Sequence, residues 1–100
     1  MNSLALETSL AFIQDLKLTR TLLVLGLSDG RSVSVPLSWY PRLMAASAKE
    51  LNNWSIIGRG DGIHWADLDE DISLESVLLG HPSRESQKSL SQWFAQRGNA

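Results

Sequence analysis

The sequence predicts an α+β domain: a small antiparallel sheet of two hairpins plus a lead strand, with one helix between the hairpins and two C-terminal helices. Two observations indicate the sheet. Alternating apolar residues flank Ser28-Asp29-Gly30, and two shorter apolar runs flank the glycine-rich residues 58–62. A tight turn between such runs is typical of a β-hairpin. A third observation indicates the last helix, because Leu90, Trp93 and Phe94 recur at the spacing of one helical face.

Composition limits the classes of function. The 100 residues, of which 43% are apolar, suit one compact domain over residues 1–100. The net charge of -2 argues against broad binding to phosphate backbones. The absence of cysteine excludes disulfides, thiolate metal sites and cysteine nucleophiles. No run of residues has the pattern of a signal peptide or a membrane span, so we expect a cytoplasmic protein without a membrane partner.

The first half of the chain is predicted to be mainly extended. Residues 1–10 have no clear period and are expected to form a loose lead-in, followed by a strand over Ile13–Leu18. Residues 21–36 form the first hairpin, because Gly30 accepts the positive φ of a tight turn. Its first strand is apolar on both faces and its second on one face only. The first strand is therefore expected at the centre of the sheet and the second nearer an edge.

A helix is expected between the two hairpins. Ser38 is its expected N-cap, with Pro41 in the first turn, and residues 52–53 are expected to close it. The second hairpin follows over residues 54–65. Beyond the acidic residues, Ser73 is expected to cap a short helix that ends at Gly80, and a polar helix is expected over residues 84–97.

Four segments together resemble a bacterial family. They are Leu27-Ser28-Asp29-Gly30-Arg31, then Val35-Pro36-Leu37-Ser38-Trp39-Tyr40-Pro41-Arg42-Leu43, and then Asn53-Trp54 with Gly62-Ile63-His64-Trp65-x-Asp67-Leu68-Asp69-Glu70-Asp71-Ile72-Ser73. This pattern is similar to that of the domain-of-unknown-function family number 2442, over residues 13–80, with a C-terminal helical extension over residues 83–98. The resemblance implies a small α+β domain. It implies no catalytic residue, and it suggests a toxin-antitoxin-like pairing with another small protein.

Residues 58–71 contain several patterns that resemble chemical motifs. Asp67-x-Asp69-x-Asp71 has the spacing of a calcium loop, but Ile72 stands where the loop needs glycine. A looser metal site formed by these three carboxylates and His64 stays open, as does His64 acting as a base with Asp67 or Glu70. The glycines of residues 58–62 precede a strand, not a helix, and so do not form a phosphate loop or a cofactor site. Solvated acids ahead of a helix N-terminus are the simpler interpretation.

Charge is concentrated in one part of the sequence. Residues 61–83 carry six acids and no Lys or Arg, and this stretch adjoins aromatic residues. A mixed acidic and aromatic surface suits a basic protein partner. The expected partner-binding residues are Trp65, Asp67, Asp69, Glu70, Asp71, Trp39, Tyr40 and Arg42.

Three functions follow from these observations. The first is a non-enzymatic interaction module, with a small protein or a second copy of the chain as partner, acting as the neutralising, antitoxin-like half of a two-gene pair. The second is a dimeric DNA-binding regulator that uses Arg84, Lys88 and Arg97 on the last helix, although the net charge does not support nucleic-acid binding. The third is a metal-dependent hydrolase built on His64 and the carboxylates. The last helix itself is expected to dock on its own domain.

Overall fold

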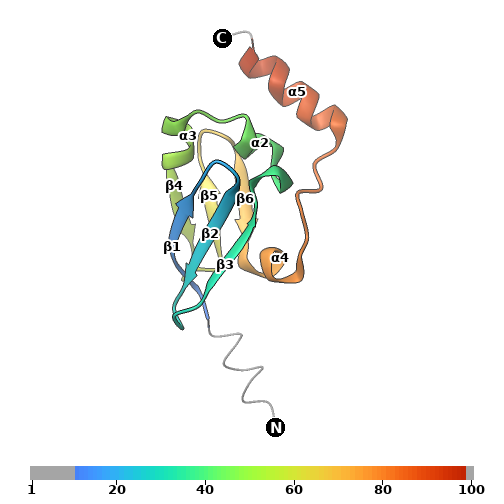
Figure 1. Ribbon diagram of the computed structural model, residues 1–100. Coiled ribbons are helices and arrows are strands. Elements are labelled where there is room, and N and C mark those ends of the chain that lie inside the picture. The colour runs from blue at the N-terminus through green and yellow to red at the C-terminus, as the bar shows by residue number, and fades with distance from the viewer. Residues whose placement is uncertain (1–10, 99–100) are drawn as a thin grey trace.

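The computed structural model describes residues 11–98 and contains two three-stranded antiparallel sheets (Figure 1). One sheet has the order β1-β2-β3 and the other the order β4-β5-β6. The strands are β1 (Ile13–Leu18), β2 (Leu22–Leu27), β3 (Ser32–Pro36), β4 (Trp54–Ile57), β5 (Gly62–Trp65) and β6 (Glu70–Ser73). The α+β class, the lead strand and both hairpins are confirmed, but the two hairpins lie in two separate sheets and not in the single expected one, because β1 completes the first sheet and β6 the second. The expected lead-in over residues 1–10 lies outside the described residues.

The first hairpin has the predicted arrangement. β2 lies between β1 and β3, so the strand that is apolar on both faces is central. Gly30 closes the turn with a φ of 93°, a conformation that glycine adopts without steric cost. Leu23 and Leu25 of β2 are fully buried, whereas β3 alternates between buried or half-buried and exposed residues along its length. The burial of each strand therefore follows the alternation in the sequence.

The hydrophobic core lies between the two sheets. It combines residues of the first sheet with Ile63 and Trp65 of β5, which have no exposed surface. The sheets approach closely at Gly60, whose carbonyl accepts a 2.8 Å hydrogen bond from the backbone N–H of Ile13. A Cβ atom at Gly60 would lie 2.6 Å from the Ile13 carbonyl oxygen. Glycine at this position therefore allows the two sheets to meet.

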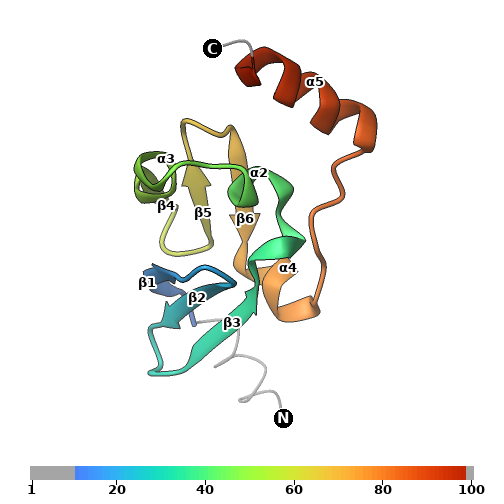
Figure 2. The same cartoon turned by 45° about the horizontal axis from the view of Figure 1, so that its top comes forward.

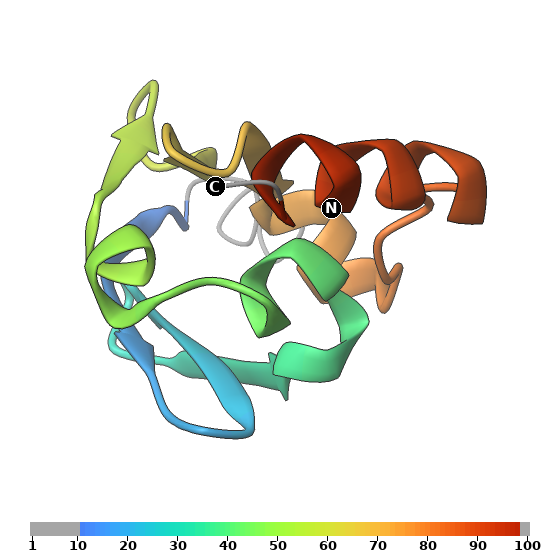
Figure 3. The ribbon, with the colours of Figure 1, turned by 90° about the horizontal axis from the view of Figure 1, so that it is seen from above.

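The single helix expected between the hairpins is replaced by three shorter ones. They are the 3₁₀ helix η1 (Leu37–Trp39) and the α-helices α2 (Pro41–Met44) and α3 (Ala48–Asn52). Tyr40 separates the first two with φ −126° and ψ 89° because the proline that follows disfavours a helical conformation. Ser38 is therefore not an N-cap; instead Ser47 caps α3 in a reciprocal box with Glu50. Figure 3 looks down on α2 and α3 at one end of the two sheets.

The C-terminal third contains one strand that the sequence analysis missed. β6 pairs with β5, while Asp69 takes a positive φ of 50° in the turn between them. The helix α4 (Leu74–Leu79) then begins at Ser73, whose hydroxyl accepts from the Ser76 N–H, and ends at Gly80 with a φ of 76°. Both ends are as predicted. The helix α5 (Gln87–Gly98) stands at the end of the extended residues 81–86 (Figure 2).

Across residues 11–98, no helix combines the length and the apolar character needed to cross a membrane.

Candidate functional site

Arg42 of α2 connects the acidic turn of residues 66–69 with the segment that leads into α5. Its Nη1 donates to the carbonyl oxygen of Leu68 at 2.8 Å and to that of Asp69 at 3.3 Å. Its Nε and Nη2 donate to the carboxylate of Glu85, which also accepts from the Ser89 hydroxyl. Hydrogen bonds from the guanidinium lower the pKa of Glu85 below its usual value. Three segments that are distant in sequence are therefore joined at one guanidinium.

The helix α5 docks on the domain through charged and aromatic side chains. The guanidinium carbons of Arg42 and Arg97 lie 5.0 Å and 4.4 Å from the centre of the Trp93 ring, within the range of cation–π contacts. Arg97 also donates two 2.8 Å hydrogen bonds to Glu50 of α3, which lower the pKa of Glu50 to about 2. Trp93 packs against the core, while Phe94 stays 42% exposed. The expected docking of the last helix on its own domain is confirmed.

A groove lies between the 66–69 turn and α5. We call it the acidic groove; it has a volume of about 330 Å³. Asp67 and Asp69 are exposed and belong to its lining, and Asp67 accepts a 3.0 Å hydrogen bond from the side-chain amide of Asn53. Within residues 11–98 neither carboxylate forms an ion pair. The side chains that line the groove are Arg42, Asp67, Leu68, Asp69, Gln92 and Trp93, with Ser89 and Gln96.

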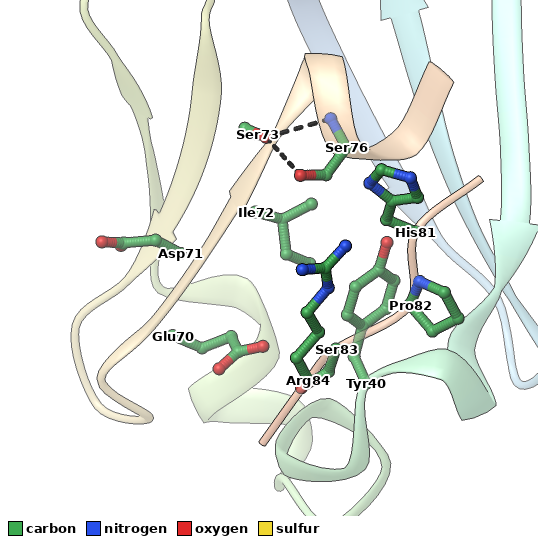
Figure 4. A pocket seen from close by; sticks show the side chains of 10 residues that line it. All are labelled: Tyr40, Glu70, Asp71, Ile72, Ser73, Ser76, His81, Pro82, Ser83 and Arg84. Carbon is green, nitrogen blue, oxygen red and sulfur yellow. Dashed lines mark hydrogen bonds between the residues drawn. The ribbon is translucent and has the colours of Figure 1, made fainter. Parts of the chain in front are cut away.

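A second hollow of about 460 Å³ lies between β6 and residues 81–84, and we call it the Tyr40 pocket (Figure 4). Tyr40 is 3% exposed, and its hydroxyl has no hydrogen-bond partner among residues 11–98. An unpaired buried hydroxyl costs about 1–3 kcal/mol. Burial raises the pKa of the Tyr40 hydroxyl above its usual value. Burial also raises the pKa of Glu70 to about 7, although the charge of Arg42 acts in the opposite direction.

The eight residues expected to bind a partner are divided among three places. The lining of the acidic groove includes Arg42, Asp67 and Asp69, and that of the Tyr40 pocket includes Tyr40, Glu70 and Asp71. Trp39 is half-buried against the core. Trp65 is fully buried, and its indole N–H donates to the Leu51 carbonyl at 3.1 Å. Trp65 therefore has no exposed surface in this structure with which to contact a partner.

The proposed catalytic and metal arrangements are not formed. His64 contacts the carboxylate of Asp71 on the neighbouring strand, not Asp67 or Glu70, because the register places His64 opposite Asp71. Within the described part of the chain, no three His, Asp or Glu residues come close enough together to hold a metal ion. The structure therefore lacks the geometry that the hydrolase interpretation needs there.

The basic surface expected on the last helix is also smaller than predicted. α5 begins at Gln87, which leaves Arg84 in the preceding extended segment, and Arg97 is paired with Glu50. Glu85, which sequence reasoning did not single out, is the group that anchors this segment. One signal was present, since Glu85 is the sole acid of residues 84–100 and lies among three bases.

Comparison with known proteins supports the fold and gives no activity. A protein of unknown function from Rhodospirillum rubrum has a crystal structure that matches with a TM-score of 0.66 and 25% identity, over 77% of this chain and 95% of that one. The solution structure of an uncharacterised protein from Chromobacterium violaceum matches with a TM-score of 0.64 and 21% identity, over 96% and 84% of the two chains. No curated protein matches the sequence. The family model described as protein of unknown function (DUF2442) matches residues 16–83, and the chain belongs to this family.

Proposed function

We propose that this protein is a non-enzymatic interaction module of the cytoplasm that binds a small basic protein at the acidic groove. The observation that carries the proposal is the pair of exposed carboxylates, Asp67 and Asp69, beside Trp93 in one hollow. Arg42, the cation in the lining of that hollow, is already paired with Glu85. The groove therefore keeps negative charge for a basic partner.

The way in which α5 is held supports the same role. α5 is held by the stacking of Arg42 on Trp93 and by the ion pair of Arg97 with Glu50. One wall of the groove therefore has a defined position before any partner binds. A preformed groove binds with a smaller loss of conformational entropy than a flexible one. Glutamines 92 and 96 on the same wall provide further hydrogen-bonding groups. In this proposal the protein acts as the neutralising, antitoxin-like member of a pair of small proteins.

The test is affinity purification of the tagged full chain from its native lysate, with a charge-matched control. The test variant combines Asp67→Asn with Asp69→Asn, and the control combines Asp15→Asn with Glu75→Gln, two exposed acids outside the groove. We expect a stoichiometric basic protein to copurify with the wild type and the control and to be lost from the test variant. Its retention should also weaken as salt increases, because the recognition is electrostatic.

Two outcomes would count against this function. If the partner is retained equally by both double variants, the groove is not its binding site. If the wild type captures no stoichiometric protein, the interaction proposal fails at its first step. Light scattering of the purified chain tests the second partner expected from the sequence, because a molar mass twice the 11.1 kDa of the monomer would show a homodimer.

A further inference from the structure

The Tyr40 pocket contains two groups of opposite charge that are not paired with each other. Glu70 reaches it from β6, and Arg84 reaches it from the segment between α4 and α5. Figure 4 shows Glu70 extending toward the pocket, whereas Asp71 points away from it. Within residues 11–98, Arg84 forms no ion pair and no side-chain hydrogen bond, although three other arginines form both. One cation and one carboxyl group are therefore available to a ligand.

Neutral polar groups border the same pocket. The Tyr40 hydroxyl has no partner in the described part of the chain and, in Figure 4, points toward Ser76 and His81. The hydroxyls of Ser73 and Ser76 lie 2.8 Å apart and are joined by a hydrogen bond. Buried polar side chains are normally satisfied, so the unpaired hydroxyl beside this pocket supports a polar group bound next to it. The Tyr40 hydroxyl is the observation that distinguishes this pocket from an ordinary surface depression.

The volume of the pocket and its charges limit the kind of ligand that it can hold. The volume of about 460 Å³ falls in the lower part of the range for small-molecule pockets, and Ile72 and Pro82 add apolar surface to the polar lining. A purely anionic ligand would face the Glu70 carboxyl, and a purely cationic ligand would face the Arg84 guanidinium. A small zwitterion avoids both repulsions because each of its ends meets the opposite charge.

From this juxtaposition we propose that the Tyr40 pocket binds a free α-amino acid, with its carboxylate at Arg84, its ammonium group at Glu70 and its side chain toward Ile72 and Pro82. Arg84 suits the carboxylate because a guanidinium can donate two parallel hydrogen bonds to it. The raised pKa of Glu70, about 7, agrees with a carboxyl group that awaits a cation, since an ammonium group placed beside it lowers that pKa again. This binding does not depend on the acidic groove or on its partner.

The experiment is isothermal titration calorimetry of the full chain with each standard amino acid, at a pH of about 8, above the Glu70 pKa of about 7. We expect at least one amino acid to bind with a Kd of about 1 mM or tighter. Arg84→Gln should weaken it by about 10- to 100-fold through loss of a charged hydrogen bond, and Tyr40→Phe by about 2- to 10-fold. Arg20→Gln is the matched control, because Arg20 is exposed and does not line the pocket.

Two analogues of the best amino acid test the zwitterion directly. The amine that lacks its carboxylate and the acid that lacks its ammonium group should each bind at least about tenfold more weakly. A carbon-detected NMR titration of Glu70 should show its pKa falling from about 7 when the amino acid is bound. Circular dichroism of Arg84→Gln and Tyr40→Phe confirms that each variant is folded before its affinity is interpreted.

The proposal is overturned if no standard amino acid binds at concentrations up to about 10 mM. It is also overturned if Arg84→Gln and Arg20→Gln weaken binding equally, or if either analogue binds as tightly as the amino acid. Binding of short peptides in place of free amino acids would likewise refute it, because the two charged groups would then have been assigned to the wrong ligand.

Discussion

Among the polar side chains, that of Arg42 is the one whose removal should destabilise this structure most. We consider Arg42→Met, which keeps an unbranched stem of similar length but removes the guanidinium. The side chains of Arg42 and Glu85 are only 14% and 11% exposed. Removal of one partner leaves the other nearly buried and without its counter-charge. The hydrogen bonds to the Leu68 and Asp69 carbonyls and the contact with Trp93 are lost in the same step.

The magnitude follows from this burial. Breaking a buried ion pair from one side costs about 3–5 kcal/mol, and the residual exposure of this pair favours the lower end, about 3 kcal/mol. A domain of this size has a total stability of about 5–15 kcal/mol, so the loss is a large fraction of it. With a urea m-value of about 1–3 kcal/mol/M, the unfolding midpoint should fall by about 1–3 M.

Urea denaturation and amide hydrogen exchange measure the effect together. A double-mutant cycle with Glu85→Gln measures the interaction free energy of the pair. Arg42→Met should lower the free energy of unfolding by less in the Glu85→Gln background, where the buried carboxylate is gone. Arg31→Met is the matched control, because the Arg31–Asp29 pair is 53% and 39% exposed and its loss should leave the midpoint nearly unchanged. Hydrogen exchange should show that α5 opens faster in Arg42→Met. The amides of β2 and β5 should still exchange only through global unfolding.

The pH dependence gives a second check on the same pair. The folded pKa of Glu85 is below its value in the unfolded chain, so the pair stabilises the protein above the unfolded pKa, and this stabilisation is lost as pH falls through the folded pKa. The destabilisation caused by Arg42→Met should therefore shrink in acid. The reasoning is refuted if Arg42→Met shifts the midpoint no more than Arg31→Met does, or if α5 exchanges at the wild-type rate.

Three further predictions concern single residues of the pocket and the turns. Because Glu70 has a folded pKa of about 7, wild-type stability should decline as pH rises above the unfolded value near 4.5 and through 7. Glu70→Gln should remove this decline and be more stable above pH 7, by about 1–2 kcal/mol in urea titrations because solvent screens part of the effect at this half-buried carboxyl group; a pH-independent difference would contradict the assignment. Tyr40→Phe should raise the free energy of unfolding by about 1 kcal/mol, because it deletes an unpartnered buried hydroxyl; a loss of stability would show that the hydroxyl has a partner. Gly60→Ala should cost about 1–3 kcal/mol more than Gly30→Ala, since both glycines have positive φ but only Gly60 lies against Ile13; equal costs would argue against that contact.

Local chemistry explains which elements were predictable. The hairpin at Gly30 and the two ends of α4, at Ser73 and Gly80, depend on residues within a few positions of one another, and all three were found. The break at Tyr40 also had a local signal that was passed over, since proline restricts the residue before it. The same is true of the Ser47 and Glu50 capping box.

β6 was missed for a different reason. Asp and Glu are uncommon in strands, and the four residues Glu70–Ser73 show only one buried apolar side chain, Ile72. Pairing with β5 supplies the hydrogen bonds that hold this segment extended, so its structure depends on a neighbouring strand and not on its own propensity.

The fold class, the order of the strands within each hairpin and the place of the negative charge follow from the amino-acid sequence. The tertiary structure alone decided that Trp65 is enclosed in the core, that Arg42 meets Glu85 across 43 positions, and that Tyr40 shares a pocket with Arg84. The physical reason is the range of the interactions. Turns, caps and alternation act over a few residues and are encoded locally, whereas burial and charge pairing depend on which distant segments the packing of the two sheets brings together.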